Sequence, residues 1–402
     1  MYRFGGTLLS IADVCALLLV SLIVLRDIRS FGLNMLFLFL AMILIIHTCV
    51  VIIFSTLDNN YMVDLLGTTL RLLFIYFILS ISDKYFIFEF GKKVLILTAA
   101  VATFYLFIQY GLSFFGIYAA GGIPILNQYT FRDDVTEYIN DVAKYGLIYR
   151  PRSFFEEPAH FCQYAIVAVT LVLFDQGENT KLSRRIVTLC LLGAGILFSM
   201  SLLGWIALTV IGFLYGMFLI KNKKYAIVFA SCSGILLIVF LILCNTQVFQ
   251  NVIESKFLDQ SISSDSRFQG LNVFSTLEEQ GVFYLLFGNG MLATDTYYNG
   301  ILRIFISFGI LGFIVASSIF LLGLRKYKTN QLAKVLILLL TILSFGSEII
   351  FGKFILVFLA FIHEKSEAND GVKNEKIRLN YNTQGNKSWR RSTSIGDAKG
   401  IF

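Results

Sequence analysis

The stretch LNMLFLFLAMILIIHTCVVIIF, residues Leu33–Phe54, decides the fold class of this chain. It contains no Asp, Glu, Lys or Arg, and as an α-helix it is long enough to cross a hydrocarbon core of roughly 30 Å. Similar runs recur, for example at Leu95–Phe115 and Ile227–Cys244. No segment alternates with the two-residue period of a membrane β-barrel strand. The sequence therefore predicts an all-α integral membrane protein.

The composition supports the same interpretation. Of 402 residues, 57% are hydrophobic and 15% are charged, and the mean hydropathy is +0.75. A soluble domain could not hide so much apolar surface from water. The 33 Lys and Arg residues exceed the 26 acids, but the excess falls in short loops and one tail. It therefore indicates membrane topology, and we expect no nucleic-acid partner.

We expect about eleven transmembrane helices, each with bounds uncertain by a few residues. The apolar run from Ile186 to Ile220 is too long for one crossing, so we divide it at Ser199-Met200-Ser201. The N-terminal run lacks a small-residue cleavage signal and is taken as the first span. The expected spans are Phe4–Leu25, Leu33–Phe54, Met62–Ser82, Val94–Phe115, Ala159–Phe174, Ile186–Met200, Leu203–Ile220, Ala226–Cys244, Gly300–Leu322, Leu332–Ser347 and Ile349–Ile362.

Lys and Arg gather in alternate loops, which marks those loops as cytoplasmic. This places the N-terminus outside and the C-terminus in the cytoplasm. Residues 1–363 then form one transmembrane domain with two long outer loops, 119–158 and 245–299. Residues 364–402 are polar and basic, and we expect a disordered cytoplasmic tail. Because long loops in a compact membrane protein usually carry function, the two outer loops are the candidate active region.

The densest polar stretch is YRPRSFFEEPAHF, residues 149–161, directly before an expected span. Arg150 and Arg152 offer planar pairs of donors that match phosphate oxygens. Glu157 or His160 can take a proton from a hydroxyl nucleophile. The alternative is a cluster of interfacial ion pairs that only anchors the helix.

Two further arginines are candidates. A capped helix is expected to start near Ser266, where its first-turn amides and Arg267 can hold an anion; the alternative is an ordinary cap with a solvated arginine. Arg303 lies about one turn inside a span and needs a partner there, or it extends outward as a structural anchor.

Other ionisable residues lie at membrane depth or its edge. Among them, we interpret His47 as a satisfied core histidine, and we expect Arg71 to pair with an acid inside the bundle. The remaining ones are Asp13, Glu348 and Lys353. No nucleotide-binding glycine loop, HExxH or GxSxG motif occurs, so we expect no metal and no cofactor.

Three stretches together resemble the O-antigen polymerase and O-antigen ligase superfamily. The first runs from Arg152 to Glu157-Pro158 and leads into a span. The others are Gly288-Asn289-Gly290 followed by Tyr298-Asn299, and Gly309-Ile310-Leu311-Gly312. Family members often have a histidine directly before the asparagine, where ligases use it for catalysis, and this chain has Tyr298 at that position.

The resemblance implies a multi-helix, metal-independent glycosyltransferase of the bacterial cytoplasmic membrane. It would polymerise undecaprenyl-pyrophosphate-linked repeat units into O-antigen or capsular polysaccharide at the outer face, with one lipid-linked glycan as donor, another as acceptor, and a chain-length regulator as a further partner. The alternatives are a polysaccharide-unit flippase or transporter and an O-antigen ligase. The implied roles are pyrophosphate binding by Arg150, Arg152, Arg267 and Arg303, acceptor activation by Glu157, His160 or Tyr298, and a structural motif of Pro158, Asn299, Gly309 and Gly312.

Overall fold

The computed structural model describes residues 11–26, 35–54, 59–118, 149–155, 157–174, 182–219, 273–290, 299–328, 330–351 and 354–362. Within these ranges the secondary structure consists of helices and their connecting turns, with no β-strand. The all-α prediction is therefore confirmed for the described part of the chain. The expected span Ala226–Cys244 and the tail 364–402 lie outside it.

Three of the described helices are long and apolar enough to cross a membrane: α2 (Met35–Phe54), α4 (Phe88–Ser113) and α14 (Gly300–Lys326). The protein is thus compatible with a membrane environment. The other helices are α1 (Ile11–Arg26), α3 (Asn59–Tyr85), α6 (Pro158–Phe174), α7 (Leu182–Phe198), α8 (Leu202–Leu219), α12 (Val273–Gln280), α13 (Val282–Phe287), α15 (Gln331–Gly346), the 3₁₀ turn η4 (Ile349–Phe351) and a helix over residues 354–362.

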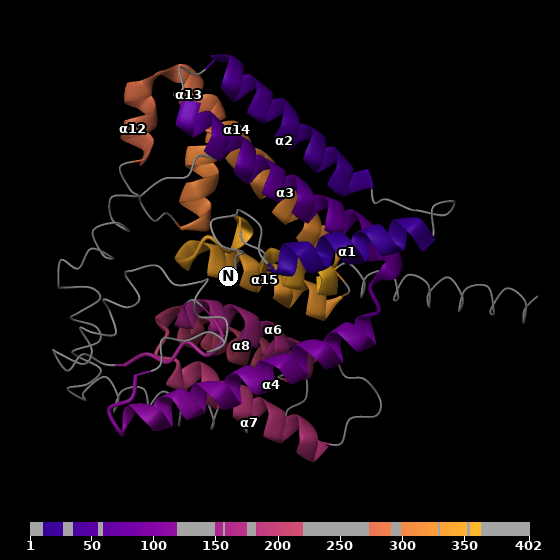
Figure 1. Cartoon of the computed structure of the whole chain (residues 1–402), viewed down its shortest axis with the longest axis vertical. Coiled ribbons are helices and arrows are strands. Elements are labelled where there is room, and N and C mark those ends of the chain that lie inside the picture. The colour runs from indigo at the N-terminus through magenta and orange to yellow at the C-terminus, as the bar shows by residue number, and fades with distance from the viewer. Residues whose placement is uncertain are drawn as a thin grey trace, which may run out of the picture.

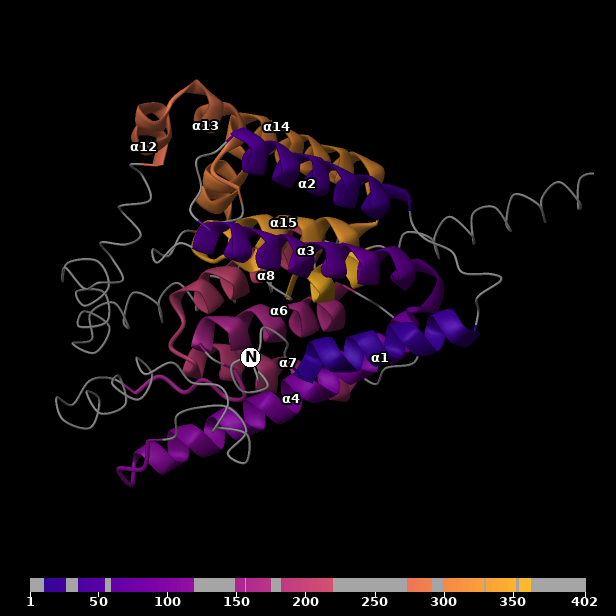
Figure 2. The ribbon, with the colours of Figure 1, turned by 45° about the horizontal axis from the view of Figure 1, so that its top comes forward.

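The helices form two groups with α15 between them (Figure 1). One group contains α4, α6, α7 and α8, and the other contains α2, α3 and α14, with α12 and α13 against α14. The view in Figure 2 keeps the same grouping. Helix α15 contacts α6 and α8 on one side and α14 on the other. Residues 354–362 contribute to the cores of both groups, so α15 and this last helix join them.

Large apolar side chains cover much of the outer surface. Leu97 and Phe104 of α4, for example, are each 64% exposed, and comparable residues project from α2 and α14. A water-soluble protein rarely exposes apolar patches this extensive. A hydrocarbon environment would cover these side chains, and each helix already satisfies its own backbone hydrogen bonds there.

Apart from shifts of a few residues at helix ends, the observed helices differ from the expected spans in three places. Helix α4 starts at Phe88, ahead of the expected Val94, and its added first turns carry an i,i+3 ion pair of 2.8 Å between Glu89 and Lys92. The expected span Ile349–Ile362 is divided into η4 and the separate helix 354–362. Helix α14 continues past Leu322 and is broken at Gly309.

Candidate functional site

The stretch before α6 is fixed on α4 by a buried amide. Ser153 has φ 56°, an uncommon conformation for a residue with a Cβ atom. Its backbone N–H donates to Oε1 of Gln109 at 2.7 Å, its carbonyl accepts from Nε2 of Gln109 at 3.3 Å, and its hydroxyl donates to the Ala102 carbonyl at 2.6 Å. The ring of Phe154 stacks on Tyr105 with centroids 4.6 Å apart. These bonds give the arginine-containing stretch one defined path over α4.

Arg150 contacts the turn between α7 and α8. Its Nε donates to the carbonyl of Met200 at 3.1 Å, and Met200 itself has φ 52°. The hydroxyl of neighbouring Ser199 lies 3.0 Å from Sγ of Cys162 in α6. The turn thus lies at the place where the sequence predicted it, and Arg150 is anchored there rather than isolated.

Glu157 and His160 frame the start of α6. Pro158 occupies the first position of the helix, where its missing N–H costs nothing. The carboxylate of Glu157 is exposed. The ring of His160 stacks on Phe354, with centroids 5.3 Å apart and an interplanar angle of 28°. Both groups that the sequence nominated as proton acceptors therefore lie at one end of α6.

Arg303 has the partner that its position required. One of its guanidinium nitrogens lies 3.0 Å from Oε1 of Glu348, with side-chain exposures of 12% and 30%. Asn299 caps α14, its Oδ1 accepting from the backbone N–H of Leu302 at 2.9 Å. The next residue, Gly300, donates its N–H to the Ser347 carbonyl at 2.9 Å. The first turn of α14 is thus bound to the turn that follows α15.

Gln163 connects this pair to α6. Its Nε2 donates to the hydroxyl of Ser347 at 2.8 Å, and its Oε1 is buried without a partner among the described atoms. Gln163 lies about one helical turn after His160. Through Gln163 and Ser347, the start of α6 and the Arg303–Glu348 pair meet at the same end of the bundle.

A second contact locks the end of α13 against the break in α14. The N–H groups of Asn289 and Gly290 donate to the carbonyls of Ile306 and Ser307 at 2.7 and 3.0 Å. Gly288 has φ 73° and Gly309 has φ 65°, and a Cβ atom on either would lie within 2.6 Å of backbone atoms of the opposite segment. Both glycines are required because two backbones approach each other directly.

Gly312, by contrast, faces a side chain. A Cβ atom there would lie 2.0 Å from Cβ of Phe308. It therefore packs against the aromatic residue that precedes the break.

Two of the predicted site residues, Arg267 and Tyr298, lie outside the described residues, so their roles stay predictions. Within the described part, the structure brings the start of α6, with Glu157 and His160, to the same end of the bundle as Asn299 and Arg303. Arg150 and Arg152 lie on the stretch that leads into it. No group of three His, Cys, Asp or Glu side chains there is arranged to hold a metal ion.

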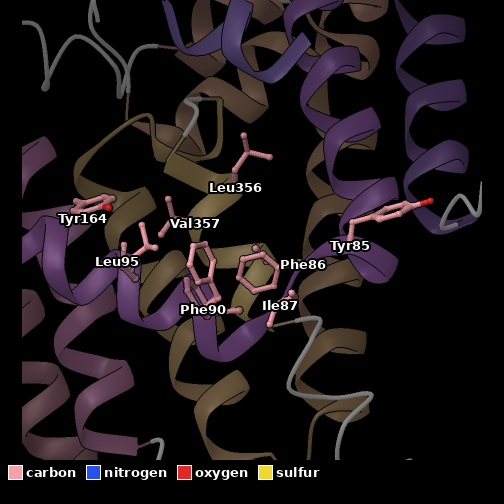
Figure 3. Close-up of a pocket in the computed structure, with 12 residues that line it drawn as sticks. Tyr85, Phe86, Ile87, Phe90, Leu95, Tyr164, Leu356 and Val357 are labelled. Carbon is pink, nitrogen blue, oxygen red and sulfur yellow. The ribbon is translucent and has the colours of Figure 1, made fainter. Parts of the chain in front are cut away.

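A groove in the described structure lies elsewhere. It has a volume of about 590 Å³ and lies between the junction of α3 and α4, Tyr164 of α6 and the helix 354–362 (Figure 3). Its lining is almost wholly hydrocarbon and contains none of the predicted site residues. No charged side chain that could bind a phosphate lines this groove.

Several residues of the candidate site were missed from the sequence. Gln109 and Gln163 are single amides inside long apolar runs, and Ser347 ends another. Polar residues at membrane depth are expensive unless they bond to something, so these interruptions were a usable signal.

No protein-family model matches this sequence, and comparisons with curated proteins and with solved structures also give no match.

Proposed function

We propose that this protein polymerises lipid-pyrophosphate-linked oligosaccharide units at the outer face of the bacterial cytoplasmic membrane. In this proposal the chain crosses the membrane about eleven times, with the start of α6, the start of α14 and the two long loops outside. A hydroxyl of the acceptor unit attacks the anomeric carbon of the donor glycan. The lipid pyrophosphate leaves with the electron pair of the broken bond.

One observation supports the proposal most. Gln163 and Ser347 tie the start of α6, with its acid and histidine, to the Arg303–Glu348 pair. Guanidinium groups stabilise the charge that develops on a leaving phosphate, and a carboxylate or imidazole can accept a hydroxyl proton. Both kinds of group lie at one end of one bundle, beside the arginine stretch held by Gln109.

The test is a deletion strain complemented with single variants. We expect Arg152→Ala and Arg267→Ala each to abolish long polymer while single-unit glycan persists and the protein remains in the membrane. The matched control is Arg184→Ala, because Arg184 is exposed near the start of α7, at the opposite end from the Ser199-Met200 turn. A normal polymer length distribution in both test variants would refute the assignment.

A transporter is the second candidate, and the break in α14 favours it, since interrupted helices are common in transporters. The two functions predict different products in the deletion strain. Loss of a polymerase leaves single-unit glycan on the cell surface, whereas loss of a flippase traps lipid-linked units on the cytoplasmic side. Loss of a ligase removes all surface glycan, single units included.

A further inference from the structure

Three segments that meet at the end of α13 each carry a buried polar atom without a partner among the described atoms. Nδ1 of His47, Oδ1 of Asn289 and Oγ of Ser307 have no partner among the described atoms, and Ser307 is only 1% exposed. Two contacts hold these segments together: His47 Nε2 lies 2.7 Å from the Phe287 carbonyl, and the N–H of Asn289 donates to the carbonyl of Ile306, the residue before Ser307. A buried polar group without a partner costs about 1–3 kcal/mol. Three such atoms at one place indicate a ligand.

The chemistry of that ligand follows from the tautomer of His47. A carbonyl oxygen only accepts hydrogen bonds, so the short contact to Phe287 places the ring proton on Nε2. Nδ1 then carries a lone pair. With Oδ1 of Asn289 it offers two acceptors, and the hydroxyl of Ser307 can donate or accept. A hydroxyl group, which can donate one hydrogen bond and accept another, matches this set.

The position links the cluster to the Arg303–Glu348 pair. Ser307 lies four residues after Arg303 on α14, which is about one turn or 6 Å along the helix. His47 contacts Phe308 at 4.7 Å between ring centroids, and Phe308 stacks on Phe351, three residues after Glu348. The cluster therefore lies beside the turn of α14 that carries Arg303, and Phe308 and Phe351 connect it to the segment that carries Glu348.

We propose that His47, Asn289 and Ser307 form the subsite for the attacking hydroxyl of the acceptor glycan, and that Nδ1 of His47 accepts its proton while Glu157 at the start of α6 orients the acceptor. This rests on the polymerase proposal above. The hydroxyl oxygen forms the new glycosidic bond, the anomeric carbon–oxygen bond to pyrophosphate breaks, and the proton stays on His47 as an imidazolium. Nε2 continues to donate to Phe287 throughout, which holds the ring in place.

The experiment uses the purified full-length protein and the lipid-linked repeat unit extracted from the deletion strain. His47→Gln keeps an N–H donor near the Phe287 carbonyl but removes the proton acceptor. We expect kcat to fall about 10²- to 10⁴-fold, with KM changed less than about twofold because the other hydrogen bonds of the subsite persist. Cys49→Ser, an exposed change two residues away on α2, is the control and should keep wild-type rates.

If the His47→Gln variant is unstable, the Ser307→Ala variant tests the same subsite. Because the Ser307 hydroxyl has no partner in the described structure, its removal should not lower the melting temperature, yet it should raise KM about tenfold through the lost ligand bond. Wild-type kinetics in Ser307→Ala overturn the proposal, as does wild-type kcat in a stable His47→Gln. A deletion strain that still makes normal polymer refutes the polymerase function itself, so the two failures are distinguishable.

Discussion

Replacing Gly309 by Ala tests whether the crossing of α13 and α14 depends on bare backbone. A Cβ atom there would lie 2.3 Å from the Leu286 carbonyl oxygen, well inside van der Waals contact. The conformation, φ 65° and ψ −164°, is accessible almost only to glycine. Strained backbone costs about 1–3 kcal/mol and overpacking about 1–3 kcal/mol. The two together give an expected destabilisation of about 4 kcal/mol for Gly309→Ala.

The matched control is the same substitution at Gly193, in the middle of α7, where a Cβ atom meets nothing within 4 Å. There alanine should leave stability unchanged or raise it by about 0.5–1 kcal/mol. Thermal unfolding of the purified proteins in one detergent measures both, and we expect Gly309→Ala to lower the melting temperature by roughly 5 °C. Equal melting temperatures for the two variants would refute the close-approach argument.

Two further predictions concern the ties around the candidate site. In a double-mutant cycle, Arg303→Gln and Glu348→Gln should each destabilise the protein, with a coupling energy of about 1 kcal/mol because the pair is only partly screened by solvent; additive effects measured by unfolding would mean that the contact carries no energy. Gln109→Ala leaves the buried N–H of Ser153 without its acceptor and should cost about 1–3 kcal/mol. An unchanged melting temperature in Gln109→Ala would show that the turn at Ser153 is stable without its hydrogen bonds to Gln109.

The helices were largely predictable because hydrocarbon imposes a simple length rule. The expected Leu33–Phe54 became Met35–Phe54, and the expected Ala159–Phe174 became Pro158–Phe174. The turn at Ser199-Met200-Ser201 was found because one apolar run exceeded a single crossing. The break at Gly309 was not found, since hydropathy continues unchanged across it. The break lies where the backbone of Leu286 and Phe287 approaches Gly309, a contact between distant segments that hydropathy does not reveal.

The candidate site was predictable in its residue types and less so in its partners. A buried arginine implied an acid, and Glu348 was already among the ionisable residues at membrane depth, but nothing in the sequence joins it to Arg303. The interpretation of His47 as a satisfied core histidine is half correct. Its Nε2 has a partner and its Nδ1 has none among the described atoms, a distinction that depends on how α13 folds back against α2 and α14.

The interlocked glycines also constrain the order of biogenesis. The segment with Gly288 leaves the ribosome before α14, yet its binding surface is the backbone of Ile306, Ser307 and Phe308. Contacts with α2, such as that between His47 and the Phe287 carbonyl, are available to α13 earlier, but its backbone partner appears only once α14 has been synthesised. The close approach of the two backbones is therefore completed late, and we expect a chain truncated before Gly309 to hold residues 273–290 less firmly.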